Sequence, residues 1–107
     1  MTRCEFFTEE DRITGFSVSG HSGYAEAGAD IVCAAISAVV SMVEATVNDV
    51  CGGKAKVRVK EADARVTLTL PTSCDEEDTI QAILAGMMVY FIDLRDQYPD
   101  YIEVLEV

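Results

Sequence analysis

The chain has 107 residues, half of them apolar and a quarter charged, which is enough for a globular domain with its own core and shows no sign of disorder. Nineteen acidic residues against eight basic ones give a net charge of -11, which argues against a nucleic-acid binder because phosphate contacts need clustered Lys and Arg. This charge favours cationic partners, although an acidic surface also serves solubility alone. We expect residues 1–107 to form a single domain.

The sequence carries no recognisable signal for secretion, membrane insertion or metal binding. The N-terminus, MTRCEFFTEEDR, lacks the apolar core of a signal peptide, and the longest apolar stretch, residues 31–40, is too short to span a bilayer. The cysteines Cys4, Cys33, Cys51 and Cys74 are well spread and include no C-x-x-C pair. We therefore expect reduced thiols in the cytoplasm, with neither a disulfide framework nor a zinc site, and no cofactor.

The first half of the chain predicts two strands, a loop and a helix. Residues 3–7 and 13–19 read as strands joined by a polar hairpin turn. Residues 20–29 contain three glycines and little periodicity, which predicts a mobile loop. A helix is expected to begin near Asp30, whose side chain can cap the first-turn amides, and to run through Val50 to the Gly52–Gly53 pair.

The second half predicts another hairpin, a second helix and a last strand. Residues 56–60 and 65–70 both alternate apolar and polar, with a turn between them. Ser73 and Glu76 match a capping box, and the apolar residues behind it follow helical spacing as far as Tyr98, before Pro99. Residues 101–107 read as a strand. The order ββαββαβ predicts an α+β fold, with a mixed or antiparallel sheet covered by two helices.

The candidate chemistry rests on His21, the only histidine, and Cys33. A thiol and an imidazole suffice for nucleophilic cysteine catalysis, since the base converts the thiol into a thiolate. Cys33 is expected near the start of its helix, where the positive end of the helix dipole favours a thiolate. The structural alternative is that Cys33 is a buried core thiol and His21 an ordinary surface residue.

The residues around this pair leave several roles open. As a helix cap, Asp30 would accept hydrogen bonds from backbone amides that an oxyanion would need. If the Asp30 side chain turned toward His21 instead, it would orient the imidazole as the third member of a triad. Ser37 follows one helical turn after the cysteine and could donate a hydrogen bond into the site, or bond back to its own helix. Gly20 and Gly23 flank the histidine and permit unusual backbone angles or the close approach of a ligand.

The segment Gly20–Ser37, G-H-S-G-Y-A-E-A-G-A-D-I-V-C-A-A-I-S, resembles the signature of the bacterial ribosomal-processing cysteine protease family, Prp. The chain length and element order fit the family as well, and Ser22 stands where a small residue such as alanine is common. The resemblance implies that Cys33 is the nucleophile, His21 the general base and acid, and Asp30 an auxiliary residue. It also implies that the loop over residues 20–29 closes over substrate.

The family trims an N-terminal extension from a large-subunit ribosomal protein after a pair of aromatic residues, and its members form homodimers. A basic ribosomal protein precursor suits the acidic surface, and no direct contact with nucleic acid or membrane is expected. The aromatic residues need an apolar pocket, for which Tyr24 and apolar residues facing the loop are candidates. Two other hypotheses stay open: a non-catalytic acidic module that binds a ribosomal protein during assembly, and a redox-sensing thiol domain.

Overall fold

The computed structural model describes residues 1–20 and 30–107 of the chain. Its elements are, in order, β1 (Thr2–Glu9), β2 (Arg12–Ser19), α1 (Ile31–Ala45), β3 (Lys56–Lys60), β4 (Arg65–Thr69), α2 (Glu77–Gln97) and β5 (Ile102–Glu106). A π-helical segment, Thr46–Val50, continues α1, and a short 3-10 turn, Glu61–Asp63, joins β3 to β4. The predicted order ββαββαβ is confirmed.

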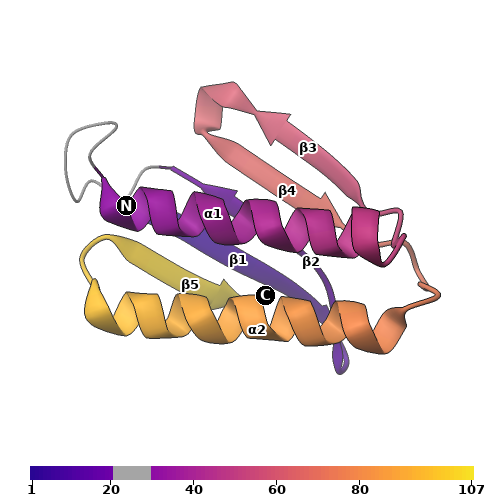
Figure 1. Cartoon of the computed structure of the whole chain (residues 1–107). Helices are drawn as coiled ribbons and strands as arrows, with labels where there is room; N and C mark the ends of the chain where they lie inside the picture. The colour runs from indigo at the N-terminus through magenta and orange to yellow at the C-terminus, as the bar shows by residue number, and fades with distance from the viewer. Residues whose placement is uncertain (21–29) are drawn as a thin grey trace.

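The five strands form one mixed sheet with the order β3-β4-β2-β1-β5. The pairs β1–β2, β2–β4 and β3–β4 are antiparallel, whereas β5 pairs with β1 in parallel. Figure 1 shows both helices running side by side across the same face of the sheet. No helix of the described residues covers the other face, and the two helices over a mixed sheet confirm the α+β fold expected from the sequence.

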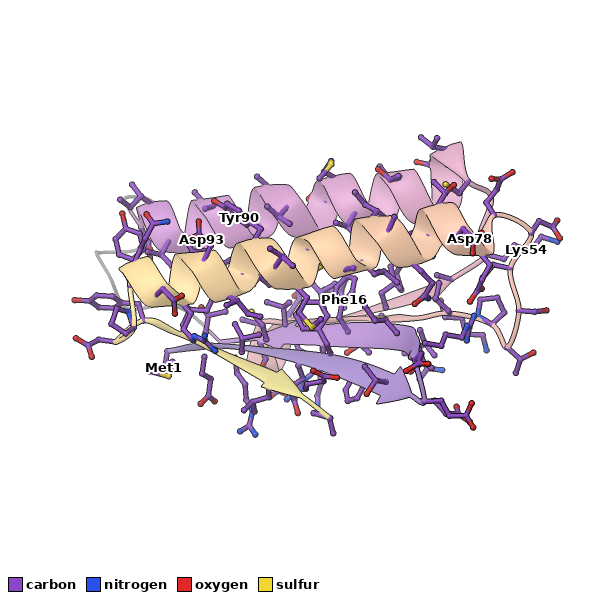
Figure 2. All side chains as sticks on the ribbon, turned by 90° about the horizontal axis from the view of Figure 1, so that it is seen from below. Met1, Phe16, Lys54, Asp78, Tyr90 and Asp93 are labelled. Carbon is purple, nitrogen blue, oxygen red and sulfur yellow. The ribbon has the colours of Figure 1, made fainter. Side chains whose placement is uncertain are left out.

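The core lies between this sheet and the two helices, because alternate strand residues point to the helical side. Phe6 on β1 pairs with Phe16 on β2, and their rings lie 6.4 Å apart, centroid to centroid. Phe91 of α2 lies over them, with its ring 6.2 Å from that of Phe6. All three side chains are buried, and Figure 2 shows Phe16 between the strands and the helices. These contacts hold the helical layer on the sheet.

The first helix is longer than the apolar stretch that stands out in the sequence. The helical residues Ile31–Val50 are long and apolar enough to cross a membrane. The core helix of a globular domain can have the same length and composition. Val32, Ile36, Val40 and Val43 are buried against the domain core. The face of the helix that carries these four residues covers the sheet, whereas Ile31, Met42 and Val50 are exposed.

The second helix begins later than the Ser73–Glu76 capping box predicts, at Glu77, and no side chain caps it. The residues of the predicted box lie in the preceding connection, where Arg12 holds them in place. Its guanidinium donates to the Pro71 carbonyl oxygen at 2.8 Å and lies 3.8 Å from the Cys74 sulfur. These contacts attach the connection to β2, and the capping prediction is wrong because the helix begins only at Glu77.

Candidate active site

Asp30 is the N-cap of α1, as the sequence predicts. Its backbone is extended, and its Oδ1 accepts a hydrogen bond from the Cys33 amide at 3.0 Å. Its carbonyl oxygen accepts the next one, from the Ala34 amide, also at 3.0 Å. The amides of the candidate nucleophile and of the residue after it are therefore both engaged by Asp30. Whether Asp30 also orients His21 concerns a residue outside the described part of the chain.

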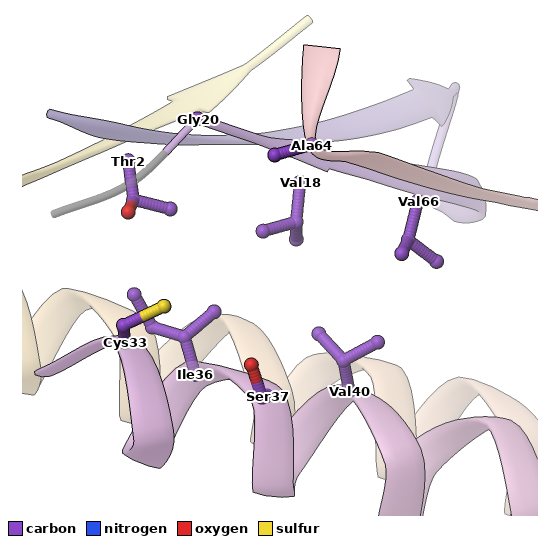
Figure 3. Close-up of a pocket in the computed structure, with 9 residues that line it drawn as sticks. All are labelled: Thr2, Val18, Gly20, Cys33, Ile36, Ser37, Val40, Ala64 and Val66. Atoms are coloured by element: carbon purple, nitrogen blue, oxygen red, sulfur yellow. The ribbon is translucent and has the colours of Figure 1, made fainter. Parts of the chain in front are cut away.

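Cys33 is half-buried in the first turn of α1 and lines a cavity of about 150 Å³ between this helix and the sheet. Ser37, one turn further along, lines the same cavity. The rest of the lining is mainly apolar, as Figure 3 shows, with Val18, Ile36, Val40, Ala64 and Val66. The thiol thus opens onto a small apolar pocket.

Thr2, at the start of β1, supplies a polar group to this pocket. It is 2% exposed, and its hydroxyl oxygen has no hydrogen-bond partner among the described residues. Figure 3 shows its side chain reaching from the sheet toward the end of the pocket that Cys33 lines. The Thr2 amide donates to the Tyr101 carbonyl oxygen at 3.0 Å, so the sheet fixes the backbone that carries this hydroxyl.

Gly20 directly follows β2 and also lines the pocket. It has a φ of +84°, and a Cβ at this position would lie 2.7 Å from the Met1 carbonyl oxygen. Both constraints favour glycine, as the sequence suggested for a residue beside a functional loop. His21, Gly23 and Tyr24, the other residues predicted for this site, lie outside the described residues.

The other three cysteines have different surroundings. Cys4 is fully buried under the helices, and burial, reinforced by the negative charge of Glu103, raises the pKa of its thiol to about 12. Cys74 is half-buried, and burial also raises the pKa of its thiol. Cys51 packs against the core beyond the end of the first helix. None of the four cysteines forms a disulfide, and Cys33 alone among them lines the pocket.

The sequence interpretation did not single out Thr2, because it began the first strand at Arg3. A period-two signal was available: Cys4 and Phe6 are inward-facing, and extending their alternation by one step places Thr2 on the same face. The sequence gives no indication that the hydroxyl is unpaired, because this depends on which residues of β5 and α1 lie next to it.

Comparison with known proteins identifies the family. A family model described as cysteine protease Prp matches residues 1–103. A Bacillus subtilis protein named ribosomal processing cysteine protease Prp is 30% identical over 94 residues, which cover 86% of this chain and 84% of that protein. The crystal structure of Prp from S. aureus with a covalently linked product peptide superposes with a TM-score of 0.89 at 21% identity, covering all of both chains.

A further crystal structure, SMU.848 from Streptococcus mutans, has a TM-score of 0.87 at 18% identity and covers all of this chain and 94% of that one. These structures share the fold described above. The family match extends over nearly the whole chain and agrees with the resemblance seen in residues 20–37. The chain therefore belongs to the cysteine protease Prp family.

Proposed function

We propose that this protein removes the N-terminal extension of a large-subunit ribosomal protein precursor during ribosome maturation, with Cys33 as the nucleophile. The observation that carries the proposal is the position of Cys33, in the first turn of α1 and open to an apolar pocket. The name of the Bacillus subtilis relative, a ribosomal processing cysteine protease, supports the choice of substrate.

In the proposed reaction, His21 takes the proton from the Cys33 thiol, and the thiolate attacks the carbonyl carbon of the scissile peptide bond. The imidazolium then gives its proton to the leaving amine, which leaves a thioester on Cys33. Water, deprotonated by the same imidazole, hydrolyses this thioester and restores the thiol. His21 directly follows Gly20 in the chain, and Gly20 lines the pocket. Asp30 and Ser37 serve as auxiliary residues around the thiol.

The pocket beside Cys33 suits an apolar side chain next to the scissile bond. Its volume of about 150 Å³ is comparable to that of an apolar cavity that accepts benzene. Val18, Ile36 and Val66 supply apolar walls from both the sheet and the helix. An aromatic residue on the amino side of the cleaved bond, as the family resemblance implies, would place its ring there.

The decisive experiment follows cleavage of a peptide spanning the precursor extension by the parent protein and three variants, under reducing conditions. We expect cleavage by the parent, loss of at least about 10³-fold in kcat for Cys33→Ala and His21→Ala, and parental activity for the matched control Cys51→Ala. Turnover by Cys33→Ala would place the nucleophile elsewhere. Binding of the precursor without turnover by the parent protein would favour the non-catalytic module instead. A thiol that is reactive but cuts no peptide would favour the redox sensor.

We also propose that the protein acts in the cytoplasm as a homodimer on a basic precursor. Large apolar residues are exposed on the helical layer, among them Met42 on α1 and Val89 and Tyr90 on α2, and they offer surface for a second copy. Light scattering should give a mass near twice that of the 11.6 kDa chain. A monomeric mass at micromolar concentration would contradict the dimer without affecting the proposed chemistry.

A further inference from the structure

The proposed reaction needs a hydrogen-bond donor that the backbone around Cys33 does not supply. Attack on a peptide carbonyl produces a negatively charged oxygen, and hydrolases stabilise this charge with donors fixed in advance. The amide of the nucleophile, or of the residue after it, commonly serves as one such donor. Here the Cys33 and Ala34 amides both donate to Asp30 at 3.0 Å. Another group must therefore contribute.

Thr2 carries a hydroxyl that is suitably placed and not otherwise used. Its oxygen is buried and has no hydrogen-bond partner within the described residues. Buried hydroxyls are normally paired, so an unpaired one that faces a pocket indicates a ligand that completes it. Thr2 and Cys33 line the same end of this pocket from opposite sides, β1 above and α1 below in Figure 3. A group bound between them can contact both side chains.

The backbone that carries the Thr2 hydroxyl is held in place by the sheet. The Thr2 amide donates to the Tyr101 carbonyl oxygen at 3.0 Å, and Thr2 stands opposite Ile102 in the parallel β1–β5 pair. A donor on a hydrogen-bonded strand needs little reorganisation when charge develops near it, which is the condition for effective electrostatic stabilisation.

We propose that the Thr2 hydroxyl donates a hydrogen bond to the oxyanion formed when Cys33 attacks the substrate carbonyl. The proposal rests on Cys33 being the nucleophile. As the sulfur–carbon bond forms, the carbonyl π pair moves onto the oxygen, which accepts the Thr2 hydrogen bond without taking its proton. When the carbon–nitrogen bond breaks, the pair returns to reform the carbonyl, and the leaving amine takes its proton from the imidazolium. Thr2 is then a catalytic residue that touches the reacting atoms.

The test compares peptide cleavage with alkylation by iodoacetamide, which modifies a thiolate without forming an oxyanion. Thr2→Val removes the hydroxyl and keeps the shape of the side chain, Thr2→Ser keeps the hydroxyl, and Thr69→Val is the matched control on the exposed part of β4. We expect kcat to fall about 10²-fold in Thr2→Val with little change in KM, while Cys33 is alkylated at the parental rate. Thr2→Ser should recover most of the activity, and Thr69→Val should lose none.

Three results would overturn the proposal: parental cleavage by Thr2→Val, an equal loss of cleavage and alkylation, or no recovery in Thr2→Ser. Urea unfolding accompanies each measurement, and we expect Thr2→Val to be at least as stable as the parent because it removes an unpaired buried hydroxyl. If the Thr2→Val protein does not fold, Thr2→Ala is used to remove the same hydroxyl. Failure of both variants to fold would assign Thr2 a purely structural role and overturn the proposal. Persistent cleavage by Cys33→Ala would instead refute the proposed nucleophile, and Thr2 with it.

Discussion

Cys4 and Cys33 show how the same side chain acquires different properties from its surroundings. Cys4 lies on the inner face of β1 and is fully buried, and this burial, followed by the charge of Glu103, raises the pKa of its thiol to about 12. Cys33 is half-buried at a helix start and borders a pocket. Only a thiol that can reach substrate as a thiolate can act as a nucleophile, so Cys4 is a core residue.

We expect Cys4 to resist alkylation in the folded protein. At pH 8 its thiol is almost entirely protonated and has no solvent access, so iodoacetamide should modify it at least about 10²-fold more slowly than the half-buried Cys51. Mass spectrometry of peptides after timed labelling measures both rates in one sample. In urea the two cysteines should react alike. Equal rates in the folded protein would contradict the burial of Cys4.

The sequence predicted single residues well where the chemistry is local. Asp30 was expected to cap α1, and it does, because capping depends only on residues three positions apart. The unpaired state of the Thr2 hydroxyl could not be predicted, because it depends on which residues distant in sequence lie next to it. The capping-box prediction failed for the same reason: Arg12, on β2, holds the residues before α2.

At the level of elements, the start of α2 is attached to the β1–β2 hairpin by two side chains one helical turn apart. Glu77 accepts from the Arg12 guanidinium at 2.6 Å and 3.2 Å. Gln81 pairs with the backbone of Ile13, accepting from its amide and donating to its carbonyl oxygen, both at 2.8 Å. These contacts join the Arg12 side chain and the Ile13 backbone, at the start of β2, to α2 and set where α2 crosses the sheet.

Replacing Glu77 with glutamine should destabilise the protein in a pH-dependent way. The hydrogen bond from Arg12 lowers the pKa of the Glu77 carboxyl, so its contribution is present above the pKa of the unfolded chain and is lost as pH falls through the folded value. Because Glu77 is about one-third exposed, we expect a loss of only about 1 kcal/mol at pH 7.

Urea unfolding of the parent and Glu77→Gln proteins between pH 7 and pH 3 tests this expectation. The difference in unfolding free energy should shrink toward zero at the acidic end. Glu44→Gln on α1 is the matched control, since Glu44 forms no ion pair among the described residues, and it should change stability by less than about 0.5 kcal/mol. A difference between parent and Glu77→Gln that stays constant over the whole pH range would contradict the charged interaction.

The strands and helices themselves could be predicted because period-two and helical patterns are local. The two hairpins, β1–β2 and β3–β4, could also be predicted, because strands joined by a short turn pair as antiparallel neighbours. The pairing of β5 with β1 in parallel could not be predicted, because it joins segments about 100 residues apart and depends on how α2 crosses the sheet. The sequence left the choice between a mixed and an antiparallel sheet open for this reason.

At the level of the whole molecule, charge is distributed unevenly. Five of the eight basic residues alternate with inward-facing positions and lie on the open face of the sheet, namely Arg3, Lys56, Arg58, Lys60 and Arg65. With these residues on the open face, the excess of acidic groups falls on the rest of the molecule, which includes the helical layer. We expect this surface to favour the approach of the basic precursor proposed above.

We expect the cleavage of a basic precursor peptide to depend on salt. Between about 0.01 M and 1 M ionic strength the screening length falls from about 30 Å to 3 Å, so kcat/KM should drop by about tenfold or more over this range. A peptide with the same residues around the scissile bond but no net charge should show little change. Steady-state assays with both peptides at several NaCl concentrations measure the effect. Parallel salt curves would argue against electrostatic attraction of the substrate.

The pairing of β1 with β5 has a consequence for when the sheet is completed during synthesis. Thr8 and Val107, 99 residues apart, are hydrogen-bonded, and Thr2 is bonded to Tyr101. During translation, β1 therefore cannot gain its parallel neighbour until residues 102–106 have left the ribosomal tunnel. The hydrogen bond that holds the Thr2 backbone in place forms no earlier, since its acceptor, Tyr101, immediately precedes that strand.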